Sequence, residues 1–208
     1  MTIPPVVEPD MDANVVVANA VKAFCTHQSQ RPDGKAVTAA LLELEKVTKQ
    51  SRQAIKRESL LGTWRLCFSA GKQARYQSGK PMGSGFYIPK IAIAQITFAP
   101  DPENPEQLTV ANELCVGPFQ IRFTGPARYP GKKNLLAFDF IYIEVRCLSL
   151  PLYRGAVGAK KRQGQSFEDI AIAKLPFFAF FTATENYIAA RGRGGGLAIW
   201  VRPLSTTV

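Results

Sequence analysis

Hydrophobic and polar residues follow two different spacings along this chain, and the spacing changes near Ser59. Over residues 12–24 apolar side chains recur at helical intervals, and Asp12 or Asn14 is available to cap the first turn. Over residues 35–57 they recur at mostly three- or four-residue intervals among Glu and Lys, as in an amphipathic helix with one buried face. We therefore expect two helices that pack on the rest of the protein as a lid or flank.

After Ser59 the spacing falls to two, which is the period of a β-strand. Similar stretches, separated by Pro- and Gly-rich turns, cover residues 63–69, 91–98, 108–116, 119–124, 135–145, about 178–187, and 196–202. Consecutive strands without intervening helices favour an antiparallel barrel or sandwich. We predict a mainly β protein in which a helical segment (1–58) packs on a barrel (59–208), and the two form one structural unit.

Positive charge is concentrated in the predicted barrel. The 208 residues carry a formal net charge of +10, yet the first 50 hold five basic and six acidic side chains. Basic clusters occur at Lys132-Lys133 and at Lys160-Lys161-Arg162. Such loops attract the phosphates of anionic lipid or nucleic acid. The same sequence pattern is also produced by solvated lysines in turns, whose role is to keep a protein soluble. We expect no nucleic-acid partner, because the basic residues are not interleaved with aromatic ones in a binding module.

Residue scarcity argues against several kinds of catalytic or metal site. His27 is the single histidine, and it follows a helical run where a capping or exposed role is favoured. The four cysteines form no CxxC pair, so neither a zinc site nor a hydrolytic triad is expected, and we predict no catalytic residues, metal or cofactor. We interpret the cysteines as buried thiols of a reducing compartment.

No targeting or membrane-spanning pattern is evident in the sequence. The start of the chain has no Lys or Arg before Lys22, unlike a signal or transit peptide. The longest apolar run, residues 175–181, is far below the roughly 20 residues of a spanning helix. We expect a soluble or peripheral membrane protein.

The two ends of the β region carry the most informative motif. Gly62 and Trp64 begin the first strand as Gly-x-Trp, and Arg202 ends the last one. In an up-and-down barrel these strands are neighbours, so the Arg202 cation can lie over the Trp64 ring and close the barrel. The combination resembles a lipocalin-like (calycin) barrel.

Three stretches, 59–71, 113–129 and 184–202, resemble the plastid lipid-associated proteins, or fibrillins, of plastids and cyanobacteria. Within these stretches, the residues that match the family's two motifs, Leu-x-Gly-x-Trp-x-Leu and Arg-Gly-x-x-Gly, are Leu60, Gly62, Trp64, Leu66, Arg191, Gly192 and Gly195. The resemblance covers most of residues 35–202. It implies a non-enzymatic protein that binds or sequesters a carotenoid, quinone or lipid and is linked to photoprotection. It also implies the cytoplasmic side of a cyanobacterial thylakoid membrane, or a plastid.

Alternation nominates the side chains that would line such a barrel. Each is more often an ordinary core residue than a ligand contact, because burial alone requires apolar side chains there. The nominated lining residues are Trp64, Leu66, Phe68, Val110, Leu114, Phe119, Ile121, Phe123, Phe138, Phe140 and Tyr142.

Two further features have a functional and a structural interpretation. An anionic membrane surface would be contacted by Phe177 and Phe178 together with the upstream Lys160, Lys161 and Arg162. In the structural interpretation, the phenylalanines are instead buried beneath the helices. Arg191 has two interpretations. It would orient the polar end of a ligand, or it would bond backbone carbonyls of the turn at 191–196, which is the favoured interpretation.

Two alternative functions stay open on the sequence. A calycin-type lyase that attaches bilin chromophores to proteins would have a barrel of similar outline, but no motif here matches that family specifically. A scaffold that docks an enzyme of isoprenoid or quinone synthesis would use the basic face and the aromatic run, with the barrel only structural.

Overall fold

The computed structural model of the protein describes residues 12–26, 30–158 and 166–203. Two helices come first, α1 (Ala13–Cys25) and α2 (Gly34–Ser51). The Asp12 and Asp33 carboxylates accept backbone N–H groups of the first turn of α1 and α2, respectively, as N-caps do. α2 ends six residues before the predicted Arg57, because Arg52 adopts a left-handed conformation with φ 52°. The chain then forms a short 3₁₀ turn, η1 (Arg57–Leu60).

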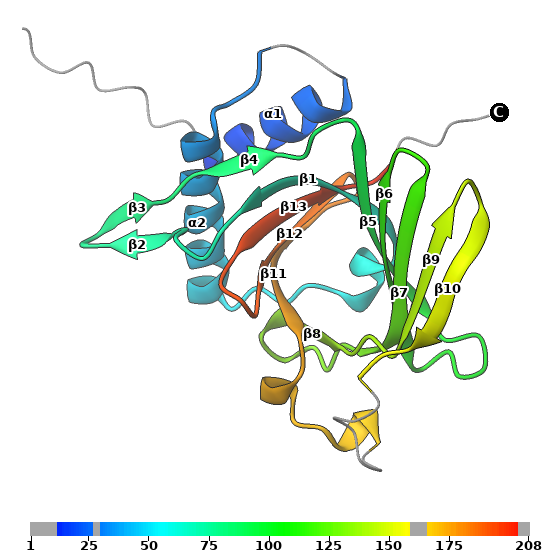
Figure 1. The fold of residues 1–208 in the computed structure, drawn as a ribbon. Helices are drawn as coiled ribbons and strands as arrows, with labels where there is room; N and C mark the ends of the chain where they lie inside the picture. The colour runs from blue at the N-terminus through cyan, green and yellow to red at the C-terminus, as the bar shows by residue number, and fades with distance from the viewer. Residues whose placement is uncertain (1–11, 27–29, 159–165, 204–208) are drawn as a thin grey trace, which may run out of the picture.

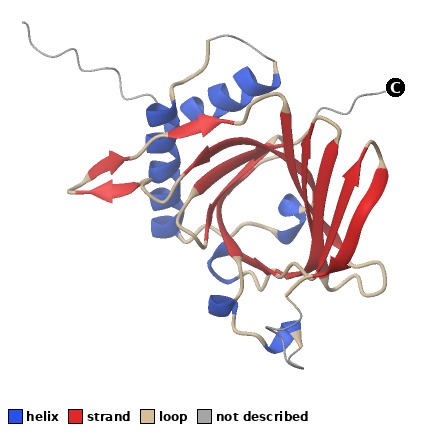
Figure 2. Ribbon diagram, in the orientation of Figure 1, coloured by secondary structure: helices blue, strands red, loops and turns tan. Residues whose placement is uncertain are grey.

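The rest of the described chain is mostly strand (Figure 2). The strands are β1 (Gly62–Ala70), β2 (Arg75–Gln77), β3 (Lys80–Met82), β4 (Gly85–Tyr87), β5 (Ala92–Pro100), β6 (Leu108–Val116), β7 (Phe119–Arg128), β8 (Leu135–Phe138), β9 (Tyr142–Cys147), β10 (Leu150–Ala156), β11 (Phe177–Ala183), β12 (Tyr187–Gly192) and β13 (Leu197–Val201). Three short 3₁₀ turns, η2 (Lys132–Asn134), η3 (Phe167–Asp169) and η4 (Ile172–Lys174), lie between strands.

Eight of these strands close into an antiparallel barrel. The order β7-β6-β5-β1-β13-β12-β11-β8 returns to β7, where Ala127 and Arg128 pair with Phe138 and Ala137. The first half of β7 pairs with β9 instead, and β9 with β10, so the β9–β10 hairpin extends the sheet beyond the barrel (Figure 1). The prediction of an antiparallel barrel preceded by two helices is confirmed at this level.

Two predicted strands are divided in the structure. The stretch 135–145 splits into β8, which closes the barrel, and β9, which leaves it, with residues 139–141 between them. The stretch 178–187 contains most of β11, a turn at 184–186 and the start of β12. Strand β10 was not predicted from the sequence, because Ser149 just before it and Pro151 within it interrupt the apolar pattern.

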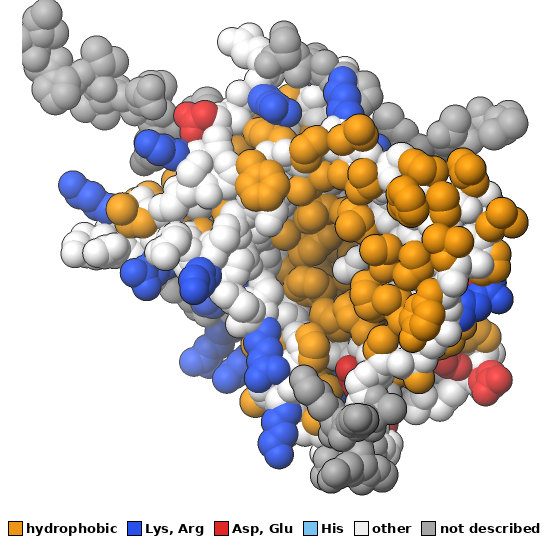
Figure 3. Space-filling model, viewed as in Figure 1, with side chains coloured by type: hydrophobic (Ala, Val, Ile, Leu, Met, Phe, Trp, Pro, Cys, Tyr) orange, Lys and Arg blue, Asp and Glu red, His pale blue; other side chains and the backbone are white. Residues whose placement is uncertain are grey.

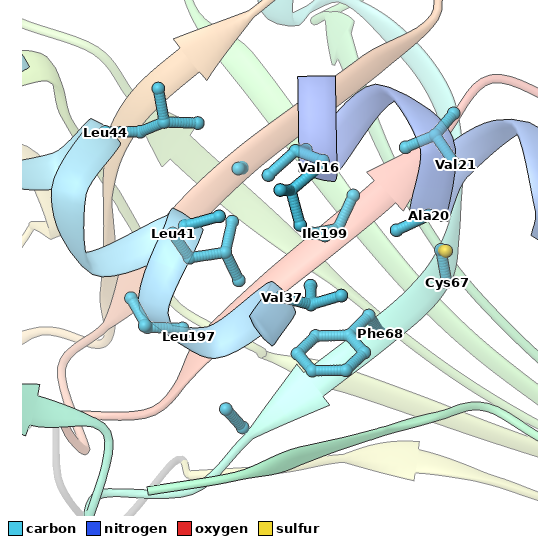
Figure 4. Packing of buried hydrophobic residues seen from close by; sticks show 14 of the residues in the cluster. Val16, Ala20, Val21, Val37, Leu41, Leu44, Cys67, Phe68, Leu197 and Ile199 are labelled. Atoms are coloured by element: carbon cyan, nitrogen blue, oxygen red, sulfur yellow. The ribbon is translucent and has the colours of Figure 1, made fainter. Parts of the chain in front are cut away.

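A bulge in β1 divides the protein into two hydrophobic cores. Leu66 lies opposite Trp200 and Phe68 lies opposite Ile199, so one residue is skipped between the two pairs. Trp200 faces the barrel interior, whereas Ile199 faces the helices. The alternation therefore changes sides, and the prediction that Phe68 lines the barrel is wrong: its ring packs beneath the helices near Val37 (Figure 4).

Both helices flank the outside of the barrel rather than cover its mouth. They pack on the outer faces of β1 and β13, and the Thr48 hydroxyl of α2 donates 2.8 Å to the backbone oxygen of Phe181 in β11 (Figure 1). Among the described residues, the structure contains no helix with the length and apolarity needed to cross a membrane.

Candidate functional site

The barrel interior is packed shut at one end. Trp64, Phe98 and Phe180 lie there in one buried cluster, and the Phe98 and Phe180 rings meet edge to face at 6.1 Å. Phe138 stacks on Phe178 at 5.2 Å, and Phe178 meets Trp200 edge to face at 5.1 Å. The protein's own aromatic side chains fill this end.

The opposite end of the same interior face is open to solvent. Cross-strand neighbours put their side chains on one face, so the register identifies each inward row. The row of Phe98 and Val110 is fully buried, whereas two rows further on Leu114 is 41% exposed and, in the last row, Phe119 is 54% exposed. We call this inward-facing end of β6, β7, β9 and β10 the open face. Its residues are Leu114, Val116, Phe119, Ile121, Val145, Leu150 and Tyr153.

Figure 3 shows the open face as a hollowed apolar surface on the side of the molecule formed by β5 to β10. Leu66, Phe123 and Phe140 are half-buried where this surface meets the packed end, and the Phe123 and Phe140 rings lie 5.6 Å apart. Contiguous exposed apolar surfaces of this kind are typical of sites that bind an apolar molecule, a membrane or a protein.

One polar side chain stands within the apolar rows. Asn112 pairs with Ile96 on one side and with Phe123 on the other, so its amide points inward at the depth where burial begins. It is half-buried, and no side-chain hydrogen bond of Asn112 exists among the residues that the structure describes. Asn112 was not predicted from the sequence, because a single polar residue in a strand carries no signal of which face it occupies.

The outer face of the same sheet is polar. Glu144 accepts a hydrogen bond from Arg154 at 2.6 Å and forms an ion pair with Arg146 at 3.0 Å, and Tyr142 shares this face through its pairing with Thr124. The hydrogen bond from Arg154, with the positive charge of Arg146, holds the pKa of the half-buried Glu144 carboxyl below its usual range. The prediction that Tyr142 lines the interior is therefore wrong, because residues 139–141 shift the alternation between β8 and β9.

Exposed apolar residues also occupy the turns at the rim of the open face. Leu148, at the tip of the β9–β10 hairpin, is 76% exposed, and the open-face residue Leu150 next to this tip is 68% exposed. Ile91 before β5 is exposed as well and stands beside the exposed Lys90. This rim therefore has exposed apolar side chains near a cation, a combination that was expected from the sequence at residues 160–162 and 177–178.

The aromatic run at 177–181 does not form an exposed patch. Alternation along β11 places Phe178 and Phe180 in the barrel and Phe181 toward the helices, and Phe177 is half-buried. Phe178 thus has its ring contacts in the interior, not on an outward surface available to a membrane. Lys160, Lys161 and Arg162, which were predicted to contact a membrane, lie outside the described residues, as does His27.

The structure brings together the three residues nominated for barrel closure. β1 pairs with β13, and the Arg202 guanidinium lies 4.2 Å from the centre of the Trp64 ring. The Trp64 indole N–H donates 2.8 Å to the backbone oxygen of Leu60. Gly62 has φ 112°, a backbone conformation that favours glycine, and a Cβ there would come within 2.8 Å of the Arg202 guanidinium.

Arg191 holds a buried ion pair as well as the backbone carbonyls expected from the sequence. Its guanidinium donates to the Glu45 carboxylate of α2 at 2.6 and 2.8 Å, and also to the Ala74 and Gly195 backbone oxygens. Burial raises the pKa of Glu45, but hydrogen bonds from Arg191 and Lys49 outweigh it and hold the pKa below its usual range. Arg191 therefore ties the glycine-rich turn to α2.

The cysteines are all free thiols, and one of them is fully buried. Cys67 lies in the core beneath the helices, where burial raises the pKa of its thiol. Cys25, Cys115 and Cys147 are half-buried, so the expectation of buried thiols is wrong for these three. Within the described ranges, the acidic, His and Cys side chains form no cluster of three that could hold a metal ion.

The fold and the open face define a protein with a closed eight-stranded antiparallel β-barrel, packed at one end and apolar at the other. Comparisons of the chain with protein-family models, with curated proteins and with solved structures found no match.

Proposed function

We propose that this protein is a non-enzymatic binder of a neutral apolar molecule, such as a carotenoid, a quinone or a lipid, and that it works at a membrane surface. The single observation that carries the proposal is the open face, where apolar rows continue from a packed core into solvent. Burying such side chains against an apolar ligand contributes roughly 25 cal/mol per Å² of area removed from water.

The resemblance to plastid lipid-associated proteins supports the same class of ligand and suggests a thylakoid surface. The rim supports membrane contact, because Leu148, Leu150 and Ile91 are exposed at the same end of the sheet and the exposed Lys90 adjoins Ile91. Apolar side chains flanked by Lys and Arg bind the boundary between lipid headgroups and acyl chains. A ligand would then pass between the bilayer and the open face without crossing water.

Replacing Leu114 by Asp is expected to weaken binding of an isoprenoid quinone at least tenfold, because the carboxylate would have to lose water beneath the ligand. The matched control is Val47→Asp, since Val47 is 48% exposed on α2, outside the barrel. Equilibrium binding to the purified full-length chain measures both. Equal affinities of the two variants, or no binding by the wild-type chain, would contradict the proposal.

Asn112→Leu is expected to separate ligands that have a polar end from those that do not. Removing one hydrogen bond costs about 1 kcal/mol, so quinone binding should weaken about fivefold. A hydrocarbon carotene should bind the variant at least as tightly as it binds the wild-type chain. If both ligands bind the two chains equally, then the Asn112 amide does not hold the polar end.

A further inference from the structure

A second cavity lies outside the barrel, in the angle between the end of α2 and strands β8 and β11. Its volume is about 690 Å³, which is within the usual range for small-molecule sites. We call it the α2 pocket. Its lining residues are Glu45, Thr48, Lys49, Arg52, Gln53, Ala54, Gly131, Lys133, Asn134, Leu135, Ala179, Phe180 and Phe181.

The α2 pocket shares no lining residue with the open face, and the barrel wall separates the two. Ala179 pairs with Leu135 on one side and with Arg191 on the other, and Arg191 reaches α2 on the outside of the barrel. The open face, by contrast, is the inward face of β6 to β10. A ligand in one site therefore does not occupy the other.

The floor of the α2 pocket is apolar, and its polar groups are already bonded within the protein. Leu135, Ala179 and the buried Phe181 contribute carbon surface. The Thr48 hydroxyl donates to the Phe181 backbone oxygen, and the buried Asn134 amide donates 2.8 Å to the Gln53 backbone oxygen. The floor thus offers a ligand an apolar surface and no unsatisfied polar group.

The lip of the α2 pocket is cationic. Among the described residues that line the pocket, Glu45 is the one acidic side chain, and its carboxylate is already bonded by Arg191 at 2.6 Å and Lys49 at 2.8 Å. Arg52 and Lys133 are exposed, and neither has an ion-pair or hydrogen-bond partner in the part of the chain that the structure describes. Figure 3 shows Lys and Arg side chains gathered on this side of the molecule.

Another cavity, of about 710 Å³, is lined by arginines that already donate hydrogen bonds to backbone oxygens of the protein. There Arg57 donates 2.9 Å to the Pro105 backbone oxygen, and Arg128 donates to the backbone oxygens of Glu168 and Ile170. These guanidinium groups are held by the protein itself, whereas Arg52 and Lys133 remain available to an anion from solution.

We infer that the α2 pocket binds a single-chain amphiphile with an anionic head, a carboxylate or a phosphate. The chain would lie over Leu135, Ala179 and Phe181, and the head would be held by Arg52 and Lys133. A guanidinium binds either oxyanion through two parallel hydrogen bonds, and an ammonium adds a point charge. This inference is independent of the ligand on the open face.

The test is titration calorimetry of the full-length chain with dodecyl phosphate and, separately, with dodecanoate, both below micelle formation. The two arms distinguish a phosphate head from a carboxylate head. Inorganic phosphate supplies the head alone and dodecanol the chain alone. At least one amphiphile is expected to bind ten or more times more tightly than either part. Equal binding of dodecanol, or of inorganic phosphate, would overturn the inference.

Two variants locate the site. The double variant Arg52→Gln/Lys133→Gln should weaken binding of the preferred amphiphile at least tenfold, and Ala179→Leu should weaken it by filling the floor. The matched control is Lys22→Gln/Lys35→Gln, which removes two exposed charges, from α1 and from the far end of α2. Unchanged binding in the first double variant, or an equal loss in the control, would show that this pocket is not the site.

Discussion

The Trp64→Ala variant is expected to lose about 3–5 kcal/mol in free energy of unfolding, as substitutions that leave a large cavity in a core do. Trp64 is 0% exposed and packs in the cluster that closes the barrel. Its indole N–H bonds the Leu60 oxygen at 2.8 Å, and Arg202 lies over its ring at 4.2 Å. The substitution removes the packing and both contacts, and equilibrium unfolding in urea measures the loss.

Two comparison variants separate these contributions. Trp64→Phe keeps most of the ring volume, so it should cost less stability than Trp64→Ala. Part of its remaining cost is the hydrogen bond that the Leu60 oxygen loses, which is worth about 1 kcal/mol. Phe86→Ala truncates an aromatic side chain that is 61% exposed, and it should change the free energy of unfolding by about 0.5 kcal/mol or less. A cost below about 1 kcal/mol for Trp64→Ala would contradict the role of this residue in closing the barrel.

Breaking the pair between Glu45 and Arg191 is expected to have the second largest effect. Arg191→Met should cost about 3 kcal/mol, because removing one partner of a buried pair leaves the other charge inside. The Glu45 side chain is only 7% exposed, and the Ala74 and Gly195 oxygens also lose their donor. Adding Glu45→Gln to Arg191→Met should restore part of the loss, and chemical denaturation of the two single variants and the double variant measures the coupling.

The pH dependence of this pair has a definite sign. The pKa of Glu45 is lowered in the folded protein, so its contribution to stability is present above the pKa of the unfolded chain, about 4.3, and is lost as the pH falls through the folded value. Arg191→Met should therefore lose less stability than the wild-type chain below about pH 4. The control is Lys46→Met, whose partner Glu43 is exposed. Equal acid sensitivity of all three chains would count against the buried pair.

Local signals in the sequence predicted the helices and most strands because their causes are local. An aspartate followed by helical spacing is enough to start α1 and α2, and alternation over 108–116 is enough to form β6. The end of α2 was misplaced because apolar spacing continues to Ile55, although the backbone turns at Arg52. The neighbourhood of Trp64 and Arg202 was also predictable, since the first and last strands of an up-and-down barrel are adjacent.

The candidate site was only partly predictable. Leu114, Phe119 and Ile121 were nominated correctly as inward-facing, because β6 and β7 alternate without interruption. Phe68 and Tyr142 were assigned to the wrong face, because a bulge or a break in a strand shifts the alternation by one residue. Nothing in the local sequence distinguishes an apolar residue in the packed end, such as Phe138, from one on the open face.

The sequence by itself therefore determined the class of structure: two helices, a succession of antiparallel strands, and the residues that join the first strand to the last. Only the tertiary structure decided where the apolar surface remains uncovered. β8 closes the barrel, while β9 and β10 leave it, so inward rows that are equally apolar in sequence are buried at one end and exposed at the other. Likewise, Glu45 meets Arg191 across 146 residues. Spacing along a strand reports which face a residue occupies, but burial depends on what packs against that face.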